Sequence, residues 1–201
     1  MKGKFIVIYG SNNLGKTTQI ELLIEKLQRL NIDSVRIKYP IYNLEPTGPL
    51  INKILRHEES LDRSYSEKEI QTIYAQNRHD YQSTLEDYLS SGKNVIAEDY
   101  TGTGIAWGIT RDLDIDTLEE INKELLLPDF SILLDSETRF ISGIEKSHKN
   151  EGSAKEGIWI KNRDIHRELA KRYQWKIINA NQTRENVHNS IWQLIKDVII
   201  K

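Results

Sequence analysis

The chain has 201 residues, of which 38% are hydrophobic and 29% charged, and its formal net charge is −2 at pH 7. This length predicts one domain with a single core, spanning residues 1–201, and the small net charge argues against binding nucleic acid or an anionic membrane through bulk electrostatics. The chain contains no cysteine, which excludes disulfides and thiolate zinc sites and fits an intracellular, cytoplasmic location.

Five short apolar segments alternate with longer segments in which apolar residues recur at helical spacing. The first apolar run is too short for a signal-peptide core or a membrane span. The alternation predicts an α/β fold with a five-stranded parallel sheet, helices on both faces, and ligands at the C-terminal ends of the strands. The predicted strands are Phe5–Tyr9, Ser34–Lys38, Asn94–Ala97, Phe130–Leu134 and Lys176–Ile178, and the predicted helices are Thr17–Leu30, Ser66–Ser90, Asp116–Leu125 and Lys161–Tyr173.

The strongest motif lies directly after the first predicted strand and directly before the first predicted helix. It matches G-x-x-x-x-G-K-[ST], the phosphate-binding P-loop. The backbone N–H groups of such a loop surround a β-phosphate, while Lys16 reaches the β and γ oxygens and the Thr17 hydroxyl ligates magnesium. We therefore predict a P-loop NTPase fold that binds ATP and Mg²⁺. The expected ATP-binding residues here are Gly10, Ser11, Asn12, Asn13, Leu14, Gly15, Lys16, Thr17 and Thr18.

A polar segment, Lys146–Gly157, contains glycine and lacks periodicity, so we expect a mobile loop there. Two interpretations stay open: a plain surface loop, or a short lid over a bound nucleotide at about residues 140–160. We interpret His148, in this segment, as a solvated side chain.

Further motifs follow the P-loop in a definite order. A P-loop alone does not identify the phosphoryl acceptor, because GTPases, motor ATPases and small-molecule kinases share it. In order and spacing, the other motifs resemble the thymidylate kinase family, from Lys4 to about Val187. They are Tyr39-Pro40, Tyr74-x-x-Asn77-Arg78, Tyr100-x-x-Thr103-x-x-Ala106-Trp107, Pro128-Asp129 and Ile177-Ile178-Asn179-Ala180-Asn181.

The resemblance implies an enzyme that transfers the γ-phosphoryl group of ATP, with magnesium, to a deoxynucleoside monophosphate, in the first place dTMP. It also implies small-molecule nucleotide partners and, as is common in the family, a homodimer. Tyr74 falls where the family stacks an aromatic ring on thymine, and Arg78 lies four residues on, on the same helical face. Asn181 falls beside the adenine. The remaining expected substrate-binding residues are Tyr39, Pro40, Tyr100, Thr103 and Trp107.

Structural alternatives exist for two of these positions. Tyr74 is also typical of the core face of an amphipathic helix that leaves Arg78 in solvent, and Trp107 is also typical of a core residue.

One departure from the family pattern concerns charge at the centre of the site. Asp99 stands where the family has an arginine between the donor and acceptor phosphates, so it either repels phosphate or faces away. Glu98 takes the family's acidic position, where it holds a magnesium-bound water or accepts the acceptor's proton. Thr17 and Glu98 are the expected metal-binding residues.

The missing positive charge is expected from the lid region. Asn12 replaces a family aspartate, and Asn13 stands where one subgroup has an arginine directed at the γ-phosphate. Of the candidate cations we favour Arg163 and Lys149, and we expect Lys16, Glu98 and Arg163 to be catalytic. The candidates are Arg139, Lys146, Lys149 and Arg163.

Two other functions stay open. A deoxynucleoside kinase is favoured by Glu98 and by Ile41-Tyr42, which replaces a family arginine that holds the acceptor phosphate. A nucleotide-binding protein with weakened catalysis is indicated by Asn12 and Asp99.

Overall fold

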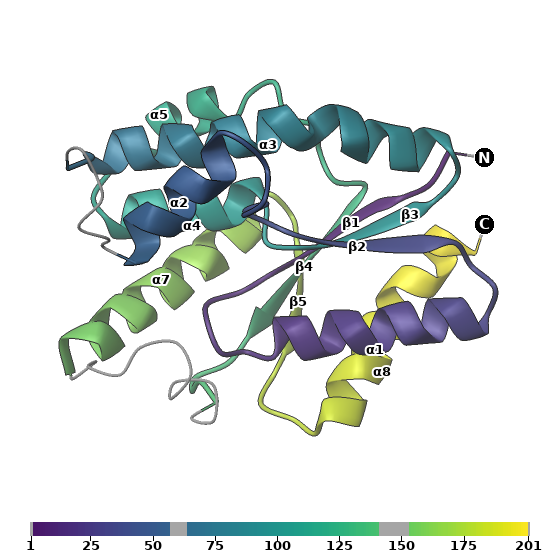
Figure 1. The fold of residues 1–201 in the computed structure, drawn as a ribbon. Coiled ribbons are helices and arrows are strands. Elements are labelled where there is room, and N and C mark those ends of the chain that lie inside the picture. The colour runs from purple at the N-terminus through teal and green to yellow at the C-terminus, as the bar shows by residue number, and fades with distance from the viewer. Residues whose placement is uncertain (1, 57–63, 141–152, 201) are drawn as a thin grey trace.

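The computed structural model describes residues 2–56, 64–140 and 153–200, and it contains a five-stranded parallel sheet with strand order β2-β3-β1-β4-β5 (Figure 1). All five predicted strands are confirmed, two of them at the predicted bounds and three extended by one residue. The strands are β1 (Phe5–Tyr9), β2 (Ser34–Lys38), β3 (Asn94–Glu98), β4 (Phe130–Asp135) and β5 (Lys176–Asn179).

Helices cover both faces of the sheet. In Figure 1, α1 and α8 lie on one face, while α3 lies on the other with α2, α4 and α5 beside it, and α7 packs along α4. The helices are α1 (Lys16–Arg29), α2 (Thr47–Arg56), α3 (Glu67–Ser90), α4 (Thr101–Thr110), α5 (Ile115–Ile121), α7 (Ser153–Arg172) and α8 (Arg184–Ile199).

Strand β1 lies at the centre of the core. All five of its residues are buried, because β3 and β4 flank it and helices cover both of its faces. Ile6 and Ile8 pack toward α1 and α8, whereas Phe5, Val7 and Tyr9 pack toward α3, as the two-residue period of a strand requires. The register pairs Ile8 with Glu98. The C-terminal ends of β1, β2 and β3 therefore meet at one edge of the sheet.

Three helices were not predicted from the sequence: α2, α4 and α8. Helix α4 carries several glycines, which lower helix propensity, yet tertiary packing requires them. A Cβ at Gly102 would collide with the Trp175 ring, and one at Gly104 would lie 2.5 Å from a terminal nitrogen of Arg78. Close packing against the site thus overrides local propensity.

The loop prediction for Lys146–Gly157 was wrong at its C-terminal end. Residues 153–157 form the first turn and a half of α7, because Ala154, Lys155 and Glu156 favour helix. The rest of that loop, with Lys146, His148 and Lys149, lies outside the described residues, as does most of the predicted lid.

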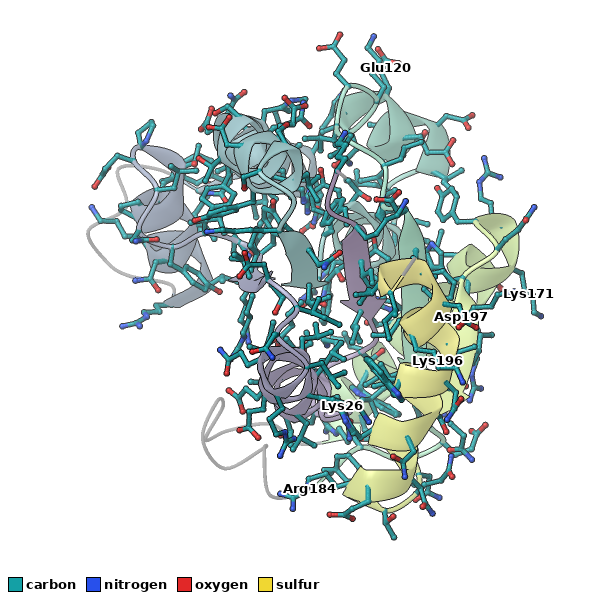
Figure 2. All side chains as sticks on the ribbon, turned by 90° about the vertical axis from the view of Figure 1, so that its right-hand side faces the viewer. Lys26, Glu120, Lys171, Arg184, Lys196 and Asp197 are labelled. Atoms are coloured by element: carbon teal, nitrogen blue, oxygen red, sulfur yellow. The ribbon has the colours of Figure 1, made fainter. Side chains whose placement is uncertain are left out.

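The outer surfaces of α1 and α8 carry charged side chains. Figure 2 shows Lys26 of α1 on the same side as Lys196 and Asp197 of α8. The Lys26 ammonium lies 4.5 Å from the centre of the Trp192 ring, so this helix pair also makes a cation–π contact. Within the ranges that the structure describes, every helix is too short or too polar to cross a membrane.

Candidate active site

The P-loop connects β1 to α1, as the motif predicts. Gly10 has a φ of 144° and a Cβ there would lie 2.6 Å from the carbonyl oxygen of Leu134, so only glycine fits beside β4. Gly15 has a φ of 80° and caps α1, whose first residue is Lys16. The free N–H groups of the first helical turn therefore point into the loop, where an anion is favoured.

Lys16 is buried and folds back over the loop. Its Nζ donates to the carbonyl oxygens of Gly10 at 2.5 Å and Ser11 at 3.1 Å, and it lies 3.6 Å from Oδ1 of Asp99. The ammonium thus sits where donor phosphates would bind, already paired with a carboxylate.

The alternative that Asp99 faces away from the site is wrong. Its carboxylate contacts Lys16 and accepts a hydrogen bond from the Thr103 hydroxyl at 2.8 Å. The residue adopts a φ of 61°, a conformation that Asp and Asn tolerate better than most residues. Burial raises the pKa of Asp99, and the nearby Glu98 raises it further, while Lys16 and Thr103 act in the opposite direction.

Glu98 is 3% exposed and is the most heavily contacted carboxylate at this edge. Its Oε1 accepts from the Thr17 hydroxyl at 2.7 Å and from Nζ of Lys38 at 2.8 Å, and its Oε2 lies 3.4 Å from Arg36. Burial acts to raise the pKa of Glu98, but the hydrogen bond and charge of Lys38, with the Thr17 bond and the charge of Lys16, outweigh burial and lower it. Glu98 is therefore held ionised.

Thr17 and Glu98 form a donor set that fits magnesium. A hydroxyl and a carboxylate oxygen 2.7 Å apart are hard oxygen ligands beside the phosphate loop. Among the described residues no group of three or more His, Cys, Asp or Glu is arranged to hold a metal. That suits Mg²⁺, which commonly takes one or two protein groups together with substrate phosphates and water.

Arg36 and Lys38 are site residues that the sequence interpretation missed. They project from β2 toward Glu98, and Lys38 pairs with Glu98 in the sheet register. The sequence signal for them was the alternation of polar residues in Ser34–Lys38. Because side chains in a strand alternate between its two faces, this pattern places both cations on the same face.

Three of the predicted acceptor residues, Tyr39, Tyr74 and Tyr100, lie near Arg78. Its side chain is buried, so the solvent-exposed alternative for Arg78 is wrong, and its NH1 donates to Asn122 at 2.9 Å. Burial lowers the pKa of Arg78, while Tyr100, Tyr9, Tyr39 and Tyr74 act to raise it.

Unpartnered polar atoms occur in this group. Tyr39 and Tyr100 lie with ring centres 5.0 Å apart. Among the described residues, both of their buried hydroxyls and Nε of Arg78 lack hydrogen-bond partners. Burial also raises the pKa of Tyr74, which is partly buried beside Arg78. These buried polar atoms therefore lie within an aromatic group around Arg78.

Asn77, one residue before Arg78, fixes the segment that follows β2. Its amide accepts from the Ile41 N–H at 2.8 Å and donates to the Ile41 carbonyl at 3.1 Å and the Thr47 hydroxyl at 3.0 Å. Helix α3 thus holds the Tyr39-Pro40 segment beside the acceptor group. The motif contained Asn77, but its role required the fold.

The lid cations that the structure describes lie near the Trp159 ring. Arg139 and Arg163 lie 6.0 and 5.6 Å from the centre of that ring, and Arg163 is ion-paired with Glu137 and Asp164. The Trp159 indole in turn donates to the carbonyl of Asn12 at 2.9 Å. Arg163 therefore lies one side chain away from the P-loop.

Two further predicted site residues lie on segments that follow β5 and β3. Asn181 is exposed in the loop after β5, where its N–H donates to Asn179 at 2.8 Å. Trp107 is partly buried on α4. Both lie on elements that begin at the C-terminal edge of the sheet.

A P-loop between a strand and a helix, with a buried carboxylate at the end of the neighbouring strand, defines a P-loop NTPase fold. The family model for thymidylate kinase matches residues 8–191, and the chain belongs to the thymidylate kinase family.

Sequence and structure comparisons agree with this family. A thymidylate kinase of Halothermothrix orenii is 28% identical over 100% of both chains. One of Dictyostelium discoideum is 29% identical over 94% of this chain and 83% of its own. The structure of a thymidylate kinase from Candida albicans has a TM-score of 0.76 at 23% identity, covers 98% of this chain and 92% of its own, and supports the fold.

Proposed function

We propose that this protein catalyses the magnesium-dependent transfer of the γ-phosphoryl group of ATP to dTMP. Family membership supports the reaction. The structural observation that best supports this reaction is the position of Asp99. Its carboxylate contacts Lys16 of the donor loop and Thr103 of the acceptor helix. The donor and acceptor groups therefore lie side by side at one edge of the sheet.

On the donor side, Lys16 and the N–H groups at the start of α1 would bind the β- and γ-phosphates. Thr17 and Glu98 would hold magnesium, Glu98 directly or through water. The metal supplies charge neutralisation on the transferred group. Asn181 would lie beside the adenine, as the family resemblance implies, and Thr18 at the start of α1 would contribute to ATP binding.

On the acceptor side, Tyr74 would stack on the base, and Arg78 would donate to base or phosphate oxygens. Among the described residues, its Nε is buried without a hydrogen-bond partner. Pro40, Thr103 and Trp107 would complete the walls of the pocket. The partners of this protein are accordingly small nucleotides.

Positive charge for the transferring phosphoryl group would come from β2 as well as from the lid side. Lys38 is paired with Glu98 but its side chain stays 48% exposed, at the mouth of the site. Arg163, with a side chain only 12% exposed, is held by two carboxylates. Lys38 is thus the more accessible of the two cations, and it offers a point charge where the family has an arginine fork.

The test is a coupled ADP-release assay with ATP and magnesium against deoxynucleoside monophosphates and the corresponding nucleosides. We expect turnover with dTMP, and a Lys16→Ala variant should lose both turnover and thermal stabilisation by ATP with magnesium. Turnover with thymidine or deoxycytidine instead would assign a deoxynucleoside kinase, the alternative that Glu98 and Ile41-Tyr42 favour. ATP binding without turnover on any acceptor would assign a nucleotide-binding protein with lost catalysis.

Residues 1–201 would act as one domain, in a cytoplasmic homodimer, as the family resemblance implies. Sedimentation equilibrium of the purified chain tests the assembly, since a dimer has twice the chain mass of 23.4 kDa.

A further inference from the structure

One buried side chain contacts both halves of the site. Asn162 lies on α7 and is 1% exposed. Its Oδ1 accepts from the Ser11 hydroxyl of the P-loop at 3.1 Å, and its Nδ2 donates to the Thr110 hydroxyl, at the end of α4, at 3.0 Å. Helix α4 begins at Thr101 and carries Thr103 and Trp107 of the acceptor side. A single amide group therefore bridges the donor loop and the acceptor helix.

The hydrogen bonds around Asn162 allow only one orientation of the amide. The Thr110 hydroxyl donates its proton to the carbonyl of Ala106 at 2.7 Å, so toward Asn162 it can only accept. Nδ2 must then face Thr110, and Oδ1 must face Ser11. Because Ser11 and Thr110 are also buried, each bond that is lost leaves a polar group without compensation from water.

Ser11 connects this amide to the phosphate-binding lysine. While the Ser11 hydroxyl bonds to Asn162, its carbonyl oxygen accepts from Nζ of Lys16. One turn earlier on the same face of α7, Trp159 donates to the carbonyl of Asn12. Helix α7 thus fixes two consecutive P-loop residues, and Asn162 joins the loop directly to α4.

We propose that Asn162 is a positioning residue that sets the separation between the donor loop and the acceptor helix. The inference rests on the proposed function, because in-line phosphoryl transfer is sensitive to that separation. A misplacement of about 1 Å can cost roughly 100-fold in rate without preventing either substrate from binding. Asn162 touches no substrate in this scheme and acts through Ser11 and Thr110.

The test compares Asn162→Leu, which has a similar shape but forms no hydrogen bonds, with Asn189→Leu at an exposed position of α8. We expect kcat of Asn162→Leu to fall about 10- to 100-fold, with the Kd for ATP and the KM for dTMP within about threefold of the wild type. Asn189→Leu should match the wild type. A kcat within twofold of the Asn189→Leu value, or losses confined to ATP affinity, would overturn the inference.

Thr110→Val keeps the inference testable if Asn162→Leu does not fold, because it removes only the hydroxyl at the α4 end. Thr110→Val should lower kcat. If Asn162 and Thr110 act through one bridge, the double variant should have the same kcat as Asn162→Leu alone. Additive losses would count against the bridge.

Hydrogen exchange separates this inference from the proposed function. In the chain without nucleotide, Asn162→Leu should speed amide exchange both in residues 10–17 and at the C-terminal end of α4. Faster exchange at only one of these places refutes the bridge. Wild-type turnover on dTMP is measured separately, so its absence would refute the function and leave the exchange result standing.

Discussion

Replacing Asp99 with Asn should tighten ATP binding. In the structure, Nζ of Lys16 lies 3.6 Å from the Asp99 carboxylate, and the two side chains are only 7% and 18% exposed, respectively. To bind, ATP has to draw Lys16 away from this carboxylate. The attraction between unit charges at about 4 Å is about 4 kcal/mol at an effective dielectric constant of about 20. Lys16 keeps its bonds to Gly10 and Ser11 in either case.

Only part of that attraction should appear in the ATP affinity, since the amide of Asn still offers Lys16 an oxygen. We expect a gain of about 1 to 2 kcal/mol, or roughly 5- to 30-fold in Kd. Asn tolerates the φ of 61° at this position, so the backbone should be preserved. Titration calorimetry measures the Kd, with Asp112→Asn, at an exposed aspartate paired with Lys161, as the matched control. Unchanged or weaker ATP binding by Asp99→Asn would refute the reasoning.

Three further predictions concern the acceptor side and the core. Tyr74→Ala should weaken acceptor binding by about 1 to 3 kcal/mol if a base stacks there, and equal weakening of ATP binding would contradict that role. Gly104→Ala should displace Arg78 and raise the KM for dTMP. Gly157→Ala should leave the KM unchanged, because a Cβ at Gly157 meets nothing within 4 Å. Urea unfolding of both variants would show whether stability changes as well. Burial lowers the pKa of His166 to about 4, so its contribution to stability is complete above its unfolded pKa and is lost as pH falls. Between pH 7.5 and 5 the wild type should lose about 2 kcal/mol more unfolding free energy than His166→Asn does, and parallel curves would refute this.

The sequence was most informative where the physical signal was local. A run such as Phe5–Tyr9 can hardly be anything but a buried strand, and the P-loop spacing predicts the turn that Gly10 and Gly15 make. The missed helices differ in this respect, because α8 carries Val187, Ile191 and Ile195 at helical spacing, whereas the composition of α4 is misleading. Helix α4 contains glycines because Trp175 and Arg78 occupy the space a Cβ would need, and no local pattern carries that information.

Side-chain pairing across the sheet was harder to predict. The sequence indicated that Asp99 is unusual, but whether it faces Lys16 depends on the backbone conformation after β3. A compensating cation was expected in the lid because Asn13 and Asp99 stand where the family, or one subgroup of it, has arginines. Lys38 could be identified as a candidate cation only from the strand register, which pairs it with Glu98 on the neighbouring strand.

The charges at this edge explain how a chain with a carboxylate at the arginine position can still be a kinase. Asp99 is matched by Lys16, and Glu98 is matched by Lys38 and Arg36, so the carboxylates are paired before any nucleotide binds. Phosphate would then compete with the carboxylates for the same cations rather than meet a bare negative charge. Such competition lowers nucleotide affinity but leaves the spacing of donor and acceptor undisturbed. Turnover then depends on a cation such as Lys38 reaching the transferring phosphoryl group, because a positioned arginine there can be worth roughly 10³- to 10⁵-fold in rate.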